Sequence, residues 1–144
     1  MHTPLNPRVS IILVVQNGAS WLPFVLNAIK EQTYPNIEVI VRDNASTDAT
    51  ATIVKRYPAM QLITSTDNVG PWVGFEQTLA HATGSYVVLL TDVLMDPNCI
   101  SEAVKVLESD PSIGAIQAKI FHMDVREGEP HFTNRLDTTG FQIS

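Results

Sequence analysis

With 144 residues, 44% of them hydrophobic, the chain is long enough to bury the core of one compact domain. Nine Lys and Arg against 15 Asp and Glu give a formal net charge of −6, which argues against nucleic acid as a partner. Cys99 stands alone, which excludes a disulfide framework, and it is expected to be a small buried side chain on a helix. Residues 1–7 lack a signal-peptide pattern, and no apolar run is long enough to span a membrane. We therefore expect a cytoplasmic protein, with any membrane tether outside this chain.

The first half of the chain alternates short apolar runs with segments whose apolar residues recur at helical spacing. We predict strands over residues 9–15, 37–41 and 61–65, and helices over residues 21–29, 49–57 and 73–82. Ser20 is the expected N-cap of the first helix, and Ser46, Thr47 or Asp48 that of the second. Pro58 then ends the second helix.

The second half continues this alternation. Residues 85–90 are nearly all apolar, which predicts a central strand covered on both faces. Asp96 suits the cap and Pro97 the first position of the helix that follows. Residues 113–121 predict a fifth strand. Strands that alternate with helices at this spacing indicate an α/β fold with a mostly parallel sheet.

From His122 onward the chain has no apolar period until a weak strand-like piece at residues 140–143. The acidic residues of this tail are expected in a loop, where they solvate a surface; they are Asp124, Glu127, Glu129 and Asp137. His122 and His131 are interpreted as polar residues rather than metal ligands. The tail reads as the beginning of a further part, so we expect the sequence to be a fragment.

Asp43 and Asn44 follow the β-branched run that ends at Val41. In an open α/β sheet, ligands bind in the crevice beyond the carboxyl ends of the strands. An ionisable side chain at the end of a buried strand otherwise contributes little, which favours a functional role for Asp43. The sequence thus predicts a binding site at this edge of the sheet.

Several motifs, in this order, resemble those of family 2 glycosyltransferases. They are Val9-Ser10-Ile11-Ile12, Asn17-Gly18, Gln32-Thr33-Tyr34-Pro35-Asn36, Asp43-Asn44-Ala45-Ser46-Thr47-Asp48, Asn68-Val69-Gly70 and Gly84-Ser85-Tyr86-Val87-Val88-Leu89-Leu90. Each motif alone is weakly specific, whereas their order and spacing together are specific. The resemblance covers residues 9–121, and residues 137–141 are similar to the family's continuation.

The resemblance implies a GT-A (Rossmann-like) fold, a three-layer α/β/α sandwich with a mostly parallel sheet, here apparently truncated. Residues 1–121 would form the nucleotide-sugar-binding subdomain and residues 122–144 the start of the acceptor-side segment. The implied activity is inverting transfer of a sugar from a nucleotide-diphosphate sugar to a hydroxyl acceptor, a saccharide or lipid-linked saccharide. Cell-surface polysaccharide or glycoconjugate synthesis is the implied pathway. The family's catalytic base belongs to the later, acceptor-binding part, so we assign none here.

The same resemblance implies donor-binding roles for four residues: Asn17, Asp43, Asn44 and Asp92. Asp43 would accept a hydrogen bond from a pyrimidine imide, and Asn44 would shape its loop or reach the nucleoside. Asp43 and Asp92 are expected to project from neighbouring strand tips into one crevice. For Ser46 and Asp48, helix capping with loop closure and contact with ligand are equally supported.

Leu90 and Asp92 occupy the place of the family's DxD-like motif, which holds a divalent cation against the donor diphosphate. Mg²⁺ or Mn²⁺ there would stabilise the charge that develops on the leaving group. Leu90 cannot ligate a metal, which leaves Asp92 as the one candidate ligand. One carboxylate together with substrate phosphates can still hold Mg²⁺, so a weakened metal site is predicted. The alternative for Asp92 is a capping residue in the loop.

Other positions depart from the family pattern. Gln16 stands where the family usually has an aromatic ring that helps to receive the nucleoside. Glu76 would repel a nearby pyrophosphate. Trp72 either packs or stacks on a base, and packing is the favoured interpretation.

These departures, with the missing acceptor part, support a second hypothesis. The chain would then be a degenerate, non-catalytic GT-A module that binds nucleotide weakly or acts in assembly. Under either hypothesis, a truncated sheet exposes apolar surface, so we expect self-association.

Overall fold

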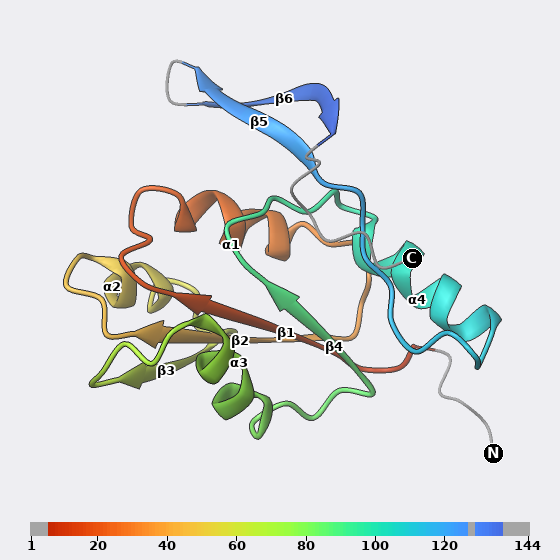
Figure 1. Ribbon diagram of the computed structural model, residues 1–144, viewed down its shortest axis with the longest axis horizontal. Helices are drawn as coiled ribbons and strands as arrows, with labels where there is room; N and C mark the ends of the chain where they lie inside the picture. The colour runs from red at the N-terminus through yellow and green to blue at the C-terminus, as the bar shows by residue number, and fades with distance from the viewer. Residues whose placement is uncertain (1–5, 127–128, 137–144) are drawn as a thin grey trace. The chain divides into compact units, whose positions relative to one another are not determined.

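The structure of the chain, a computed structural model, describes residues 6–126 and 129–136 (Figure 1). The chain divides into two compact units, residues 1–101 and 102–144, and each unit is described by itself. No helix in the described ranges combines the length and the apolar character that crossing a bilayer requires.

The first unit is built on a parallel sheet with the strand order β3-β2-β1-β4. Its strands are β1 (Val9–Val15), β2 (Ile37–Asn44), β3 (Gln61–Ser65) and β4 (Tyr86–Leu90). Ile11, Ile12 and Leu13 of β1 are fully buried. Because side chains alternate between the faces of a strand, β1 supplies core to both sides of the sheet. The parallel sheet confirms the predicted α/β class.

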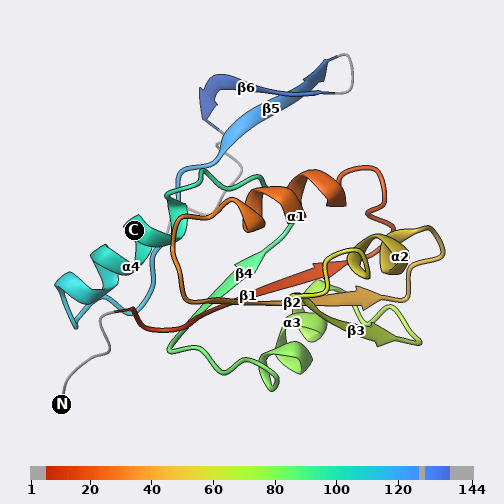
Figure 2. The ribbon, with the colours of Figure 1, turned by 180° about the vertical axis from the view of Figure 1, so that it is seen from behind.

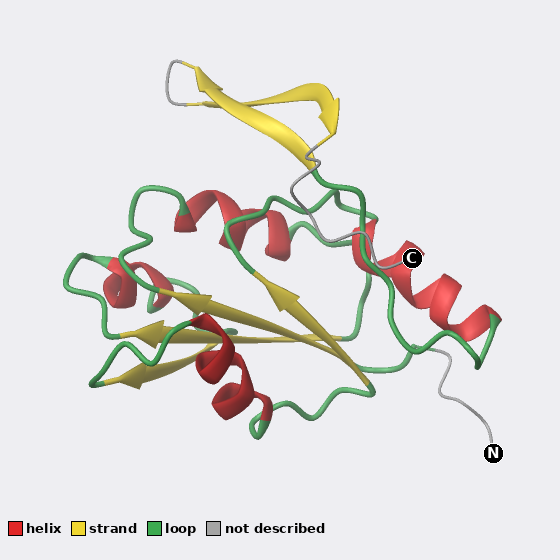
Figure 3. Cartoon of the chain, in the orientation of Figure 1, coloured by secondary structure: helices red, strands yellow, loops and turns green. Residues whose placement is uncertain are grey.

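Helices cover both faces of this sheet, as the colouring in Figure 3 shows. The helices α1 (Leu22–Lys30) and α2 (Thr50–Val54) lie on one face, and α3 (Pro71–Leu79) lies on the other (Figures 1 and 2). The crossovers from β1 to β2 and from β2 to β3 step in one direction, whereas the crossover from β3 to β4 steps back past β2 and β1. Right-handed crossovers in opposite directions put their helices on opposite faces, which gives the three layers.

The first helix buries one stripe of side chains at helical spacing: Leu22, Val25, Leu26 and Ile29. Its N-cap is Trp21, which makes no side-chain capping bond, so the predicted cap at Ser20 is wrong. The carbonyl of Gly18 instead accepts hydrogen bonds from the Trp21 and Leu22 amides, at 3.1 and 2.8 Å. A backbone carbonyl thus organises the start of the helix.

The second helix is shorter than predicted, because it ends at Val54 rather than Tyr57. After it, the amides of Arg56 and Tyr57 bond carbonyls three residues earlier, at 3.0 and 2.9 Å. Such bonds tighten the last turn into 3₁₀ geometry. Pro58 follows and cannot continue a helix.

The fourth strand is an outer strand of the described sheet, not the central strand predicted. Val87 and Leu89 are 40% and 51% exposed, although Leu90 is buried. They pair with Ser10 and Ile12, so they lie on the face that carries α3. That helix contacts β1 and β2, which leaves this face of β4 open. A continuous apolar run occurs both in central strands and in outer strands such as β4. The apolar run alone therefore did not predict the position of this strand in the sheet.

The helix α4 (Cys99–Ser109) begins two residues after Pro97, so Pro97 does not occupy its first position. Asp96 instead closes a turn ahead of the helix, and its Oδ1 accepts a hydrogen bond from the Asn98 amide at 2.9 Å. Cys99 lies on the helix as predicted, but it is only half-buried. Burial, with a smaller contribution from the charge of Asp96, raises the pKa of its thiol.

The second unit contains an antiparallel hairpin of β5 (Phe121–Arg126) and β6 (Glu129–Leu136). Residues 113–120 form no strand, so the predicted strand at 113–121 is wrong apart from its last residue. An apolar run becomes a strand only where a partner strand pairs with it. Asp124 and Glu129 lie in strands, not in a loop. Glu127, Asp137 and the piece at 140–143 lie outside the described residues.

Candidate functional site

Polar residues gather at the carboxyl edge of the parallel sheet. Asp43 pairs with Val15 of β1, and Asp92 follows β4 two residues after Leu90. Because β1 lies between β2 and β4, the two acids end strands that flank β1 rather than strands that pair directly. The strands β2 and β4 lie on opposite sides of β1, and the crossovers that lead to them step in opposite directions, so this edge holds the topological switch point where open α/β sheets bind ligands.

Asp43 is 6% exposed, and its Oδ1 accepts a hydrogen bond from the Ser46 amide at 2.9 Å. This bond holds the turn that leaves β2. Within the described ranges, Arg42 Nε is the one fully enclosed side-chain polar atom that lacks a partner. Asp43 Oδ2 has no hydrogen bond to a described residue either, but it is not one of these fully enclosed atoms. It must therefore be accessible to solvent. One carboxylate oxygen thus organises the loop, and the other is free to accept a hydrogen bond.

Asn44 is 2% exposed and joins β2 to the loop that precedes α3. Its Nδ2 donates to Asn68 Oδ1 at 2.8 Å and to the Gly70 carbonyl at 3.2 Å. Its Oδ1 accepts from the Val69 amide at 3.4 Å. Of the two roles foreseen for Asn44, the structure therefore shows the shaping of a loop, here the loop before α3.

The loops after β1 and β2 are joined by hydrogen bonds that we call the loop clamp, formed by Asn17, Ser46, Thr47, Asp48 and Thr50. The Asn17 amide donates to Ser46 Oγ at 2.9 Å, and Asn17 Oδ1 accepts from the Thr47 amide at 2.8 Å. Asn17 has φ 50°, a left-handed conformation that Asn tolerates better than most residues. Asn17, which was predicted to lie at the site, therefore holds the loops after β1 and β2 together.

Asp48 is exposed, yet both of its carboxylate oxygens have partners. Oδ2 accepts from the Ala19 amide at 3.0 Å, and Oδ1 accepts from the amide and hydroxyl of Thr50 at 2.9 and 2.5 Å. The Thr50 hydroxyl bond is the main reason that the pKa of Asp48 is lowered. For Ser46 and Asp48, the structure therefore shows loop closure rather than side chains left open for a ligand.

Asp92 is exposed, and its carboxylate has no hydrogen-bond or ion-pair partner among the residues described. Leu90 is buried in β4 opposite Leu13, so it contributes nothing polar to the edge. The described residues contain no group of three His, Cys, Asp or Glu side chains that would hold a metal by themselves. A cation would fit only if Asp92 and the oxygens of a bound ligand shared it, a mode that Mg²⁺ commonly uses.

Two side chains of α3, the helix that follows the carboxyl end of β3, were singled out in the sequence. Trp72 is 76% exposed and lies 6.3 Å from the Phe75 ring, centroid to centroid, so the favoured interpretation of Trp72 as a packed residue is wrong. Glu76 is exposed on the same helix. Pro71 suits the first position of the helix because its backbone angle is already helical, and it does not cover the ring of Trp72.

Comparison with known proteins agrees with this geometry. The family model described as glycosyl transferase family 2 matches residues 10–142. The chain belongs to glycosyl transferase family 2. EpsE of Bacillus subtilis, whose name marks it as a glycosyltransferase, is 34% identical over 109 residues, covering 72% of this chain and 39% of EpsE.

Solved structures show the same fold. The mannosyltransferase PcManGT of Pyrobaculum calidifontis, in complex with GDP-Man and Mn²⁺, is 36% identical with a TM-score of 0.71, over 77% of this chain and 35% of PcManGT. TarS of S. aureus, in complex with UDP, is 25% identical with a TM-score of 0.68, over 71% of this chain and 32% of TarS. The fold is thus that of the GT-A glycosyltransferases. The chain spans between 32% and 39% of the length of these relatives.

One buried cation of this family 2 chain was missed in the sequence. Arg42 is 7% exposed beneath α3, where its Nη2 donates to Gln77 Oε1 at 2.6 Å. Gly74 of α3 lies beside it, although the closest contact of a Cβ there would be Val14 Cγ1 at 2.9 Å rather than Arg42 Cδ at 3.4 Å. The sequence offered one signal for this buried cation. It is the placement of Arg42 in the β-branched run of β2, followed by Gly74 in α3.

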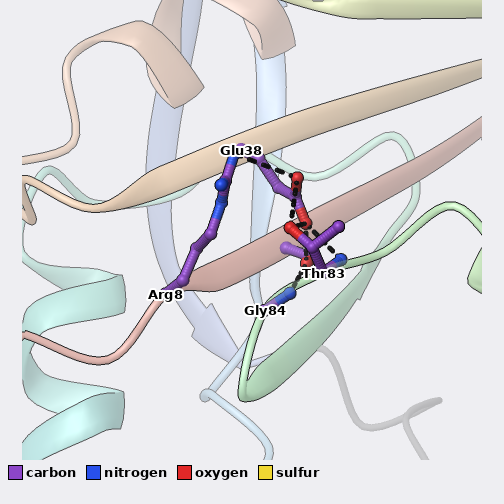
Figure 4. Close-up of polar contacts among 5 residues, drawn as sticks. Arg8, Glu38, Thr83 and Gly84 are labelled. Carbon is purple, nitrogen blue, oxygen red and sulfur yellow. Dashed lines mark hydrogen bonds and ion pairs between the residues drawn. The ribbon is translucent and has the colours of Figure 1, made fainter. Parts of the chain in front are cut away.

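A second polar cluster, also missed, lies at the opposite, amino edge of the sheet (Figure 4). The Glu38 carboxylate accepts hydrogen bonds from the Ser10 hydroxyl and from the Thr83 amide, the latter at 2.6 Å. Arg8 lies 3.1 Å from Glu38 Oε2, and because Arg8 is half exposed this ion pair contributes little. The Gly84 amide donates to Ser10 Oγ at 2.8 Å. The cluster therefore ties β1, β2 and the approach to β4 together.

This cluster predicts an acid-sensitive contribution to stability. Burial raises the pKa of Glu38, but hydrogen bonds from Ser10 and Thr83 outweigh burial and lower it below its ordinary 4.5. The stability from Glu38 is therefore fully present above pH 4.5 and is lost as the pH falls through the lowered value. We expect Glu38→Gln to lower the free energy of unfolding by about 2 kcal/mol at neutral pH. In urea denaturation the gap between variant and wild type should close in acid; a gap that is constant with pH would contradict this account.

Proposed function

We propose that this chain forms the donor-binding part of a glycosyltransferase that moves a sugar from a nucleotide-diphosphate sugar to a hydroxyl acceptor with inversion. The single observation that carries the proposal is the free Oδ2 of Asp43 at the topological switch point. The other oxygen of the same carboxylate, Oδ1, is fixed by the Ser46 amide, so the position of Oδ2 is fixed as well. A preorganised acceptor at this edge suits the imide or amide N–H of a nucleobase. GDP-Man in PcManGT and UDP in TarS support the choice of ligand.

In the proposed reaction, the acceptor hydroxyl attacks the anomeric carbon from the face opposite the leaving group. The new glycosidic bond forms as the bond to the diphosphate breaks, and the hydroxyl proton passes to a base. We assign no catalytic base, because the family resemblance places that residue in the later, acceptor-binding part. Asp43 would hold the nucleobase of the donor, and Asn44 and the loop clamp would fix the loops that surround the nucleobase.

Asp92 is the proposed ligand of a divalent cation, shared with the diphosphate of the donor. The cation, Mg²⁺ or Mn²⁺, would stabilise the charge that develops on the departing nucleotide. The Mn²⁺ in the PcManGT complex supports this role. The unpartnered carboxylate of Asp92 is available for it, whereas Leu90 is not.

The remaining parts of the proposal concern the whole protein. They are a saccharide or lipid-linked acceptor, a role in cell-surface polysaccharide or glycoconjugate synthesis, a cytoplasmic location, and residues 122–144 as the start of the acceptor side. Self-association is also proposed, and the open apolar face at Val87 and Leu89 supports it.

The alternative is a non-catalytic module that binds nucleotide weakly. Leu90 at a metal-ligand position and the exposed acid Glu76 on α3 favour it. Both observations predict weaker holding of a diphosphate, because one ligand is lost and one negative charge is added. The alternative and the main proposal differ in whether a metal strengthens nucleotide binding.

Calorimetric titration of the chain with UDP, dTDP and GDP, each with and without Mn²⁺, separates the two. We expect one nucleotide to bind, Mn²⁺ to tighten its binding about tenfold, and Asp92→Ala to remove that gain while leaving metal-free binding unchanged. Asp67→Ala, a change of another exposed acid, serves as the control. A nucleotide dissociation constant that is the same with and without Mn²⁺ would favour the non-catalytic module. The absence of binding of any of the three nucleotides would contradict the proposal.

A further inference from the structure

The motif Gln32-Thr33 follows Glu31, the C-cap of α1, and the proposed function does not use it. The side chain of Gln32 makes three hydrogen bonds. Its Nε2 donates to the Ala28 carbonyl at 3.2 Å and to the Asp96 carbonyl at 2.7 Å. Its Oε1 accepts from the Ile100 amide at 3.2 Å. One side chain thus joins the end of α1 to the start of the turn that precedes α4 and to the first turn of α4 itself.

Thr33 strengthens this junction. Its amide donates to the Pro97 carbonyl at 2.9 Å. Its hydroxyl lies 3.2 Å from the same carbonyl and 3.0 Å from Asn98 Oδ1. Residues 96–100 are therefore anchored to the end of α1 through backbone atoms as well as side chains.

Asp92 lies in the short segment between this anchor and the sheet. Leu90 is fixed in β4 by pairing with Leu13, and Asp96 is fixed by Gln32. Residues 91–95 between them are neither helix nor strand, and the Asp92 side chain has no partner of its own within the described ranges. Because so short a connection has few conformations when both ends are held, the two anchors set where Asp92 lies.

We propose that Gln32 is a positioning residue for Asp92: its bond to the Asp96 carbonyl holds the Asp92 segment where the carboxylate meets a cation on the donor diphosphate. This inference rests on the proposed function. Gln32 acts through the backbone and does not touch the ligand. Residues that orient a metal ligand typically change metal affinity about 10- to 100-fold when they are replaced.

The test measures the metal gain, the ratio of the nucleotide dissociation constants without and with Mn²⁺, by calorimetry. Gln32→Met keeps the size of the side chain and removes all three bonds. We expect it to lower the metal gain about tenfold while the metal-free dissociation constant stays within about twofold. Gln32→Glu keeps an acceptor for Ile100 but cannot donate to Asp96, and it should lower the metal gain similarly. Hydrogen exchange of the amides at residues 91–100 should quicken in both variants.

Two controls separate positioning from folding. Gln61→Met makes the same chemical change at an exposed position at the start of β3 and should leave the metal gain unchanged. In an Asp92→Asn background, Gln32→Met should have no further effect on the metal gain, because the group that it positions is gone. A purely structural role of Gln32 would not produce this coupling.

The outcomes are distinguishable. If the wild type shows a metal gain and Gln32→Met retains it, the inference is wrong and the proposed function stands. If Gln32→Met weakens metal-free and metal-dependent binding equally, Gln32 is structural and the inference is also overturned. If the wild type binds no nucleotide, or shows no metal gain, the proposed metal role fails and the inference fails with it.

Discussion

Asp43→Asn is expected to weaken nucleotide-diphosphate binding about 10- to 100-fold without unfolding the chain, because a hydrogen bond to a charged group is worth about 1.5–3 kcal/mol. The variant keeps an oxygen that accepts from the Ser46 amide, so the turn after β2 survives. It replaces the free acceptor Oδ2 with an NH₂ group, which cannot accept a hydrogen bond from a nucleobase N–H. Calorimetry gives the dissociation constant, and circular dichroism checks the fold.

Asp110→Asn is the matched control for this change. The Oδ1 of Asp110 accepts from the Ser112 amide at 2.9 Å, so its carboxylate has the same kind of local role as that of Asp43. Asp110 belongs to the second unit, whereas the strand ends that form the proposed site belong to the first. Its replacement should leave nucleotide affinity unchanged. An Asp43→Asn variant that binds nucleotide as tightly as the wild type would remove Asp43 from the donor site.

Gly84→Ala should destabilise the first unit strongly. A Cβ on Gly84 would lie 2.6 Å from Ser10 Oγ, 2.7 Å from the Ser10 amide nitrogen and 2.8 Å from the Arg8 carbonyl oxygen. Two of these atoms belong to the backbone beside β1, so the contact cannot be relieved by rotating a side chain. Overpacking of this kind costs about 3 kcal/mol, and the added methyl also disturbs the Gly84 amide bond to Ser10.

Urea denaturation measures that loss, and Gly114→Ala is its control. A Cβ on Gly114 meets nothing within 4 Å, so this variant should stay within about 0.5 kcal/mol of the wild type. If Gly84→Ala were as stable as Gly114→Ala, β4 would not approach β1 as closely as the structure shows, and the placement of Asp92 would lose its support.

Much of the first unit was predictable because its strands carry a strong local signal. The strands at Val9–Val15 and Gln61–Ser65 have the predicted bounds, and β2 extends the predicted strand to Asn44. Their β-branched runs and the helical spacing between them leave few other ways to bury apolar surface. The family motifs then pointed to the carboxyl edge of the sheet.

The errors came from features that depend on distant residues. The run at 85–90 does not reveal how many neighbours its strand has, and the run at 113–121 does not reveal that no described strand pairs with residues 113–120. The predicted cap at Ser20 failed because the Gly18 carbonyl organises the start of α1 where a side chain was expected. These outcomes are decided by which segments meet, and local propensity carries no information on that.

The polar contacts of the site were the least predictable. Asp48 and Ser46 suit capping and ligand contact equally well on sequence, and their hydrogen bonds to the loop after β1 form only when that loop approaches in the fold. Gln32 gives no local sign that it reaches residues more than 60 positions away. Side chains that bond distant backbone atoms have no periodic signature.

The central claim is that a nucleotide-diphosphate sugar binds at the carboxyl edge of the parallel sheet. Amide chemical shifts, measured by NMR while UDP or GDP with Mg²⁺ is titrated in, locate the bound ligand residue by residue. We predict that the largest changes fall on residues 16–19, 43–48 and 91–92. The amino-edge cluster of Ser10, Glu38 and Thr83 should remain unchanged. Changes centred on that cluster, or spread evenly over the sheet, would contradict the account.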